Sequence, residues 1–198
     1  MKTLISIHAY AGDQELVKSL MPFHEAHGLP ICILSPEDSP VTFLPSVLLG
    51  RRAYIGQDSL DRQLLHLRYL LAQPYDFYLM HDSDSLCISP KIPDFIFTED
   101  TFFSNEVVDP RPHATPGFPK LAYQPSYAMP REVLEKIVAV ALSVPVDSVC
   151  PYIDNIVMRW VVSAGVKSRS FNDHNFAHPV KSVAGIERFR NAMKGIYS

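Results

Sequence analysis

No apolar run in this 198-residue chain approaches the roughly 20 residues that a membrane-spanning helix requires. The three cysteines, Cys32, Cys87 and Cys150, lie far apart and form no CxxC pair, so neither a disulfide framework nor a zinc ribbon is predicted. The segment from Met1 to Tyr10 lacks the long hydrophobic stretch and the cleavage site of a secretion signal. We therefore expect a first strand there and a location in the reducing cytoplasm.

The residue types that are present form an ordinary globular composition, with 47% hydrophobic and 20% charged residues. The length suits one domain with a sizeable core, and neither an internal repeat nor a linker divides the chain. The net charge of −3 is unevenly distributed, since residues 164–198 contain six basic and two acidic side chains. Such a basic end is either a solvated surface or a contact for an anionic partner.

The most informative segment is Tyr75 to Asp84, where an aromatic and apolar stretch leads directly into Asp82 and Asp84. Residues 75–80 predict a buried strand. In an extended chain residues i and i+2 point the same way, so both carboxylates are expected at the strand's C-terminal end, where open α/β sheets bind ligands. Mg²⁺ takes carboxylate oxygens together with water and phosphate. The segment therefore indicates a metal–diphosphate site, although a solvated Asp-Ser-Asp turn is the alternative.

The opening of the chain predicts an α/β fold. Residues 3–8 alternate and are rich in β-branched side chains, which is typical of a strand. A helix follows, for which Asp13 is the expected N-cap and Pro22 the expected kink or end. Residues 31–34 predict a second buried strand. This strand–helix–strand order is typical of nucleotide-binding sheets, so we expect a mixed, mostly parallel central sheet flanked by helices.

Later segments continue this alternation. Asp58 is the expected N-cap of a helix that reaches residue 71 and precedes the motif strand. The six prolines within 109–130 predict a long functional or disordered connection, and 36–57 remain unassigned. The other predicted elements are a short helix at 94–97, a strand at 101–108, helices at 130–142 and 152–164, a strand at 166–171, a loop at 172–180 and a helix at 186–196.

Asp82-Ser-Asp84, with a helix and a strand before it, resembles the Asp-X-Asp motif of GT-A-fold glycosyltransferases. These enzymes hold Mn²⁺ or Mg²⁺ on the diphosphate of a nucleotide-sugar. In element order the resemblance covers most of the chain, and it is nearest to the retaining group of glycogenin and the lipopolysaccharide galactosyltransferases. It implies one Rossmann-like domain over 1–198, with a nucleotide-binding half at 1–108 that carries the metal motif and an acceptor-side half at 109–198.

The resemblance also implies a donor site after the first strand. His8, Ala9 and Tyr10 occupy the position whose backbone contacts the base in GT-A enzymes. Tyr10 is expected either to stack on a uracil or similar ring or to pack at the edge of the sheet. Asp58 and Arg62, one helical turn apart, are expected to touch the ribose or the phosphates, or else to form a surface pair.

Metal and diphosphate ligands follow from the same resemblance. Asp82 and Asp84 are the expected carboxylate ligands, and Ser83 between them is expected to contact the donor. Related families use a late histidine as a third protein ligand and a lysine after it on the diphosphate. His178 and Lys181 fit these roles, although their spacing is tighter than is usual in that group. A mixed oxygen and nitrogen site of this kind suits Mn²⁺ better than Ca²⁺.

Asp154 and Asn155 are the candidate catalytic residues. They open a predicted helix and resemble the acid–amide pair of retaining GT-A enzymes, and also the base of inverting ones. An inverting base needs a carboxylate within hydrogen-bond reach of the acceptor hydroxyl. We favour the retaining interpretation. The alternative role is an acid that favours the helix dipole, worth about 0.3–1 kcal/mol.

Together these residues indicate a glycosyltransferase, a hexosyl- or pentosyltransferase, that uses a nucleotide-sugar, preferably a UDP-sugar. The acceptor is open between a glycan, a protein, a lipid-linked glycan and modified DNA, with 109–130 and the basic end as its expected surfaces.

Three other classes share part of this pattern. A sugar-phosphate nucleotidyltransferase shares the sheet, but residues 8–13 contain one glycine and no basic residue where such enzymes have a Gly-rich basic loop. An iron oxygenase or zinc hydrolase would use His81, His174 and His178, yet Ser83 stands where the oxygenase triad requires a carboxylate. A non-catalytic nucleotide- or glycan-binding module remains open.

Overall fold

The computed structural model describes residues 1–52, 56–89, 91–97, 100–108, 120–143, 153–170, 176–177 and 182–194. Its central sheet has the strand order β3-β2-β1-β4-β7-β6-β8. The strands are β1 (Thr3–His8), β2 (Ile31–Ser35), β3 (Ser46–Leu48), β4 (Phe77–Asp82), β6 (Thr101–Val108), β7 (Lys120–Pro130) and β8 (Lys167–Ser170). A second, small sheet pairs β5 (Leu86–Cys87) with β9 (Phe176–Ala177).

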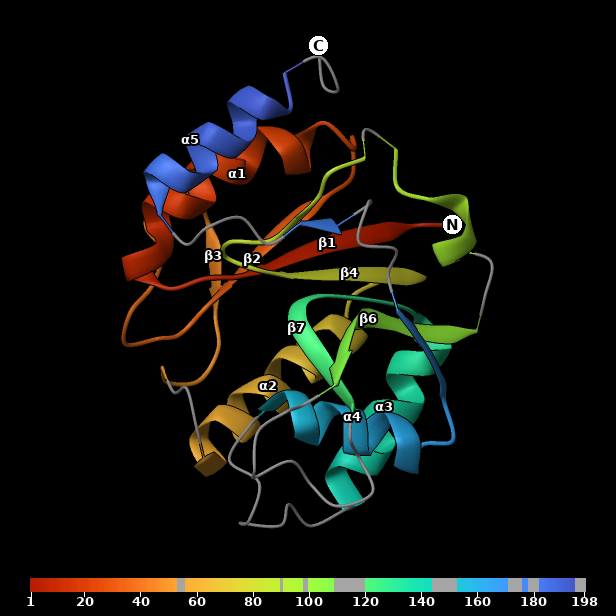
Figure 1. Cartoon of the computed structure of the whole chain (residues 1–198). Coiled ribbons are helices and arrows are strands. Elements are labelled where there is room, and N and C mark those ends of the chain that lie inside the picture. The colour runs from red at the N-terminus through yellow and green to blue at the C-terminus, as the bar shows by residue number, and fades with distance from the viewer. Residues whose placement is uncertain are drawn as a thin grey trace.

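Helices cover both faces of the central sheet. They are α1 (Gln14–Glu25), α2 (Gly56–Leu71), α3 (Arg131–Ser143), α4 (Ile153–Ser163) and α5 (Val183–Ala192), with 3-10 helices at Ala11–Asp13 and Asp94–Phe97. α1 and α5 lie on one face, and α2, α3 and α4 lie on the other (Figure 1). The predicted α/β class is therefore confirmed. Within the described ranges, no helix has the length and apolar character needed to cross a membrane.

The strand order reverses direction at β1. Pairings β3–β2, β2–β1, β1–β4 and β6–β8 are parallel, whereas β7 is antiparallel to both β4 and β6. After β1 the chain first builds β2 and β3 on one side and then adds β4 on the other. Open α/β sheets bind ligands at such a reversal, outside the carboxyl ends of the strands. The ends of β1 and β4 are thus the expected place for a site.

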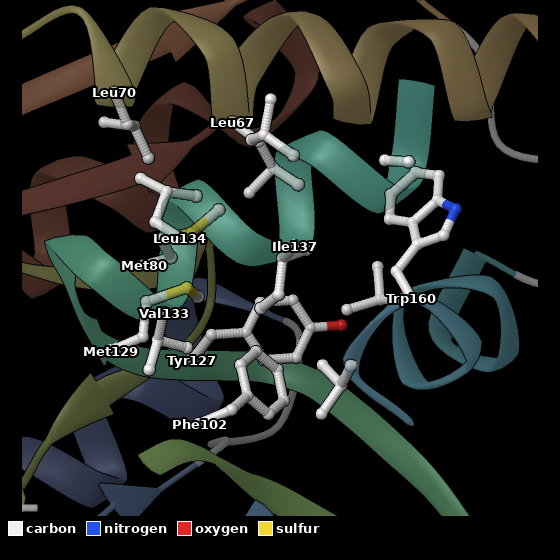
Figure 2. Packing of buried hydrophobic residues seen from close by; sticks show 14 of the residues in the cluster. Leu67, Leu70, Met80, Phe102, Tyr127, Met129, Val133, Leu134, Ile137 and Trp160 are labelled. Carbon is white, nitrogen blue, oxygen red and sulfur yellow. The ribbon is translucent and has the colours of Figure 1, made fainter. Parts of the chain in front are cut away.

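Two large clusters of buried hydrophobic residues, one on each face of the central sheet, hold the layers together, and a smaller cluster joins α1, α5 and β5. Side chains alternate along each strand, so Leu79 faces the α1 side while Met80 faces the side of α2, α3 and α4. In the larger core, Ile137 of α3 lies over the rings of Tyr127 and Phe102, with Trp160 of α4 at their side (Figure 2). Burial of large side chains of this kind contributes about 1.5–3 kcal/mol each. The helix predicted at 130–142 is confirmed as α3, and its buried face consists of Val133, Leu134, Ile137, Val138 and Ala141.

Expectations about two helix ends need correction. Pro22 does not end α1, which continues to Glu25, so of the expected kink or end the end is wrong. Asp58 is not an N-cap, since α2 begins at Gly56 and places Asp58 in its first turn. Gly28 follows the end of α1 and Gly165 follows the end of α4, with positive φ angles of 63° and 65°.

The proline-rich connection is also shorter than expected. Residues 120–130 form β7, and 109–119 lie outside the described residues. Pro130 is the last residue of this strand rather than the first of α3, and Pro125 falls where the β6–β7 register shifts between the pairs Ser104–Tyr127 and Asn105–Tyr123. A proline is tolerated there because no ladder hydrogen bond is required of it. The short strand β9 likewise lies inside the predicted loop 172–180.

Arg131 connects the C-terminal end of α2 to the N-terminal end of β4. This is the end of the strands opposite the expected site. Its guanidinium donates hydrogen bonds of 2.7 Å to the carbonyl of Leu71 and 2.8 Å to that of Gln73. Its backbone N–H donates to the carbonyl of Asp76 at 2.8 Å. One side chain therefore satisfies carbonyls that the helix end leaves without partners.

Replacing Arg131 tests how much these hydrogen bonds stabilise the fold. Arg131→Ala is expected to lower the free energy of unfolding by about 2 kcal/mol, because hydrogen bonds to a charged donor are lost and their acceptors remain partly buried. Lys136→Ala on the same helix is the matched control, since its exposed ion pair with Asp100 should contribute less than about 1 kcal/mol. Urea unfolding at neutral pH measures the loss of unfolding free energy in both variants. Equal losses would contradict a special stabilising role of the Arg131 hydrogen bonds.

Candidate functional site

The ends of β1 and β4 lie side by side. The two strands are parallel, and His8 is the register partner of Asp82. Side chains at paired positions of parallel strands leave the sheet on the same face, which here is the face covered by α2. The structure therefore brings the expected first-strand segment and the expected metal motif to one place.

The Asp-Ser-Asp motif is a buried turn. β4 ends at Asp82, the next two residues turn, and the backbone N–H of Ser85 donates to the carbonyl of Asp82 at 3.1 Å. The expectation that Asp82 and Asp84 continue an extended strand is therefore wrong. The alternative of a solvated turn is wrong as well, because Ser83 is 4% exposed and Asp84 is 0% exposed.

The two carboxylates of the motif have different surroundings. Asp82 is partly exposed at the strand end, whereas Asp84 is enclosed. The Oδ1 oxygen of Asp84 is buried without a hydrogen-bond donor among the described residues, although the residue makes other interactions. Oxygen ligands of this type suit Mg²⁺ or Mn²⁺. Within the described ranges no three His, Cys, Asp or Glu side chains gather as a metal site, and His178 lies outside them.

Asp13 holds the motif turn from the other strand end. Its Oδ2 accepts a hydrogen bond of 2.7 Å from Ser83 Oγ, and Asp13 itself is 6% exposed. The expected role of Asp13 was to cap α1. Asp13 does precede Gln14, the first residue of α1, but its side chain makes no capping hydrogen bond. The carboxylate serves the motif turn instead, a role that no local sequence pattern signals.

A buried chain of polar side chains supports the turn from the face of α1. His81 Nδ1 and Ser126 Oγ are 2.8 Å apart, and Ser126 Oγ donates to Ser85 Oγ at 3.5 Å. Ser85 Oγ in turn donates to the carbonyl of Asp82 at 3.2 Å. Burial first, then the neighbouring His24, lowers the pKa of His81 well below its usual value. A neutral His81 thus anchors the chain at neutral pH.

His8 and His66 form an imidazole pair on the α2 face. Their Nδ1 atoms are 3.3 Å apart, so one ring donates to the other. Burial first, then the charge of Arg62, lowers the pKa of His8 to about 3. Burial, His8 and Arg62 likewise lower the pKa of His66 well below its usual value. Both rings are neutral at neutral pH, and Arg62 supplies positive charge next to them.

His66 is a site residue that sequence reasoning missed, although the sequence contains a signal for it. Ser59, Gln63 and His66 recur at helical spacing beside the leucines of α2, and all three are buried. Polar residues at core positions of a helix indicate a buried polar surface. Asp58, in contrast, is exposed in the first turn of the same helix.

Tyr10 lies just beyond β1, and its ring is in contact with a cation. The guanidinium of Arg52 lies over the ring, 3.7 Å from its centroid. A Cβ at Gly12 would stand 2.5 Å from Tyr10 Cε2, so only glycine lets the ring lie this close to the backbone. Ala9 is buried, and its N–H continues the ladder to the carbonyl of Leu34 at 3.1 Å. Stacking of Tyr10 on a nucleobase stays a prediction.

The other candidate residues are not brought to these strand ends by the described part of the chain. Asp154 and Asn155 are the second and third residues of α4, but their side chains lie outside the described residues. His178 and Lys181 lie outside them altogether, as does Cys150. Cys32 and Cys87 are free thiols.

Comparison with known proteins identifies the fold. The sequence matches no family model and is not significantly similar to any curated protein. A crystal structure of a glycosyltransferase involved in the glycosylation of the major capsid of PBCV-1 superposes with a TM-score of 0.57 at 11% identity, over 96% of this chain and 100% of that one. A Bacillus anthracis protein described as a glucose-1-phosphate thymidylyltransferase gives 0.52 at 8% identity, over 98% and 95%.

These likenesses show that the chain shares its fold with a glycosyltransferase and with a protein described as a sugar-phosphate nucleotidyltransferase. At such low identities they concern the fold, and function has to be argued from the site.

A pH dependence of stability follows from the buried histidines. Burial first, then His27, lowers the pKa of His24 from 6.5 to about 3, and His24 also lies 5.1 Å from the His81 ring. His24 is protonated near pH 6.5 in the unfolded chain but only near pH 3 in the folded chain. Its contribution to the free energy of unfolding is therefore complete above pH 6.5 and is lost as the pH falls towards 3.

Between pH 7 and pH 5, His24 is expected to account for a loss of about 2 kcal/mol in unfolding free energy. His24→Leu, which fills the site without titrating, should remove that share. Urea unfolding of both proteins at the two pH values measures it. If the variant loses as much stability as the wild type, His24 is not held neutral in the folded protein.

Proposed function

We propose that this protein is a metal-dependent glycosyltransferase that transfers a sugar from a nucleotide-sugar, a UDP-sugar, to an acceptor hydroxyl. The observation that carries the proposal is the alignment of His8 with Asp82 at the reversal of the sheet. It joins the segment expected to bind the nucleotide to a buried turn with two carboxylates. A ligand crevice is expected at this position in an open α/β sheet.

The donor set of the turn fits a hard divalent cation. Asp82 and Asp84 would hold Mn²⁺ or Mg²⁺ and leave positions for water and for phosphate oxygens. Such a cation supplies charge neutralisation for the diphosphate leaving group. In this proposal His178 is a third protein ligand, and Lys181 contacts the diphosphate together with Ser83.

Nucleotide contacts would come from β1 and α2. Arg62 is placed by α2 beside His8, and its charge suits a phosphate. Asp58, in the first turn of α2, is proposed to contact the ribose, and the ring of Tyr10 is proposed to stack on the base. Since Arg52 lies over that ring, base stacking requires either that Arg52 moves or that the base uses the other ring face.

Chemistry at the sugar is assigned to the start of α4. Asp154 and Asn155 are proposed to lie under the sugar ring in a retaining reaction. The acceptor is proposed to bind on the side of residues 109–198, as a glycan, a protein, a lipid-linked glycan or modified DNA.

Donor binding and turnover test the proposal directly. Wild-type protein is incubated with UDP-glucose or UDP-galactose, with and without Mn²⁺, and followed by thermal unfolding and by release of UDP. We expect stabilisation only when a nucleotide-sugar and Mn²⁺ are present together. It should amount to about 2.7 kcal/mol when the nucleotide-sugar is at 100 times its dissociation constant. Absence of any shift and of any UDP release across these donors would contradict the proposal.

The Asp84→Asn variant tests the metal site. It keeps the size of this buried side chain, so the fold should persist, but it removes the charge that a cation needs. Metal-dependent stabilisation by UDP should be lost. Asp94→Asn, at an exposed residue paired with Lys91, is the matched control and should behave as the wild type. Unchanged Mn²⁺-dependent affinity in Asp84→Asn would rule out this residue as a ligand.

A sugar-phosphate nucleotidyltransferase is the second candidate, because one structural neighbour is described as such an enzyme. The segment after β1 argues against this function, since residues 8–13 contain one glycine and no lysine or arginine for a triphosphate. The products separate the two reactions. A nucleotidyltransferase releases pyrophosphate from UTP and a sugar phosphate, whereas a glycosyltransferase releases UDP from the nucleotide-sugar.

Substitution of Asp154 distinguishes its possible roles. If it is an inverting base, Asp154→Asn should abolish transfer and keep donor binding, because only proton abstraction is lost. If the reaction is retaining, as we propose, the variant should also hold the sugar less tightly and hydrolyse the donor more slowly. Near wild-type rates would mean that Asp154 serves only the helix, where Asn replaces Asp at little cost. Transfer, hydrolysis and donor affinity are measured in the one variant.

A further inference from the structure

We infer that Asp13 is a positioning residue that couples the nucleotide segment after β1 to the metal-binding turn after β4. The inference rests on the proposed function and adds to it a residue outside the expected donor and metal ligands. Its basis is the hydrogen bond from Ser83 Oγ to Asp13 Oδ2, which is 2.7 Å long and joins residues 70 positions apart.

The environment of Asp13 shows that its carboxylate is used for this bond. The side chain is 6% exposed, and burial of a carboxylate is costly unless a donor compensates it. The distance of 2.7 Å between the two oxygens is typical of a well-formed hydrogen bond from a hydroxyl donor. Helix capping does not explain the residue, because its side chain makes no bond to the N-terminus of α1.

The position of Ser83 in the turn explains which part of the backbone this hydrogen bond fixes. Ser83 is the residue between the two motif carboxylates, so holding its hydroxyl fixes the orientation of the backbone on either side of it. Ser85 holds the same turn at a second point, because its Oγ donates a hydrogen bond to the carbonyl of Asp82. The turn is thereby fixed at two points, and of these two partners Asp13 is the one that belongs to the nucleotide side.

The other end of the link lies in the segment expected to contact the base. The backbone N–H of Asp13 donates to the carbonyl of Tyr10 at 2.9 Å, within the tight turn that packs Tyr10 against Gly12. A displacement at Tyr10 when a nucleotide binds is therefore transmitted to Ser83 through a single side chain. Nucleotide and cation are expected to bind with positive coupling, which is reciprocal by thermodynamic necessity.

The coupling is measured as the ratio of UDP dissociation constants without and with Mn²⁺. Titration calorimetry is performed on the full chain for wild type, Asp13→Asn, Ser83→Ala and the double variant. We expect the ratio to fall about tenfold in Ser83→Ala, equivalent to about 1.4 kcal/mol, and about fivefold in Asp13→Asn, which keeps the shape and loses the charge. The double variant should be no worse than Ser83→Ala, because both changes break one link.

Two further variants separate positioning from general stability. Ser83→Thr retains the hydroxyl and should restore the ratio to within about twofold of wild type. Asp76→Asn is the matched control, since Asp76 Oδ2 also accepts a 2.7 Å hydrogen bond between the β1 and β4 segments, from the backbone N of Lys2 at the opposite edge. It should lower the melting temperature at most and leave the ratio unchanged.

The outcomes are distinguishable. If wild-type protein binds UDP in an Mn²⁺-dependent manner but Asp13→Asn and Ser83→Ala keep the wild-type ratio, or if their effects add, the link between Asp13 and Ser83 is overturned while the proposed function stands. If wild-type protein shows no Mn²⁺-dependent UDP binding, the proposed function fails and the inference fails with it.

Discussion

The parallel register between β1 and β4 is the constraint on which the candidate site depends. It pairs His8 with Asp82, and a slip by one residue would move Asp82 to the face of α1, because neighbouring side chains alternate. Apolar packing on both faces of the sheet favours this register. Tyr78 and Met80 belong to the core under α2, α3 and α4, whereas Phe77 and Leu79 belong to the core under α1, so a slip would expose both sets to the wrong partners. Apolar packing at the middle of the sheet thus decides where two polar strand ends meet.

Around those strand ends the protein buries polar groups that contribute little to folding. Asp13, Ser83, Ser85, His81 and Ser126 are all enclosed, and each is held by a hydrogen bond to another polar group. A net hydrogen bond stabilises by only about 1 kcal/mol, whereas an unmade one in a buried place costs about 1–3 kcal/mol. Apolar residues would fill the same volume without the cost of leaving a buried polar group without a hydrogen bond. Such a concentration of polar residues is expected where a site has to be preorganised, so the burial of these groups favours a functional turn over a purely structural one.

Sequence reasoning succeeded where the determining interactions are local. The strand predicted at 3–8, the buried strand predicted at 75–80 and the helix predicted at 130–142 each depend on burial of nearby apolar side chains, and all three are confirmed. It failed where the partner is distant. The prolines of β7 suggested a loop, but pairing on both sides overrides that local preference and leaves Pro125 at an irregularity of the ladder. Asp13 does occupy the N-cap position of α1, but its side chain bonds to Ser83, 70 residues away, which no local pattern could indicate. Asp82 and Asp84 are candidates that the sequence indicates, whereas the hydrogen bonds that Asp13, Ser85 and Ser126 make around them were not predicted.

The turn also changes what the two motif carboxylates can do together. In an extended strand, residues i and i+2 are separated by about 6.6 Å and their side chains run parallel, so two short aspartates converge poorly on one ion. Ligand oxygens of Mg²⁺ or Ca²⁺ lie within about 2.0–2.6 Å of the cation, which requires convergence. The hydrogen bond from the Ser85 N–H to the Asp82 carbonyl closes a turn instead, with Asp82 partly exposed and Asp84 enclosed. This turn does not have the parallel side chains of an extended strand, and it is therefore compatible with the proposed shared cation.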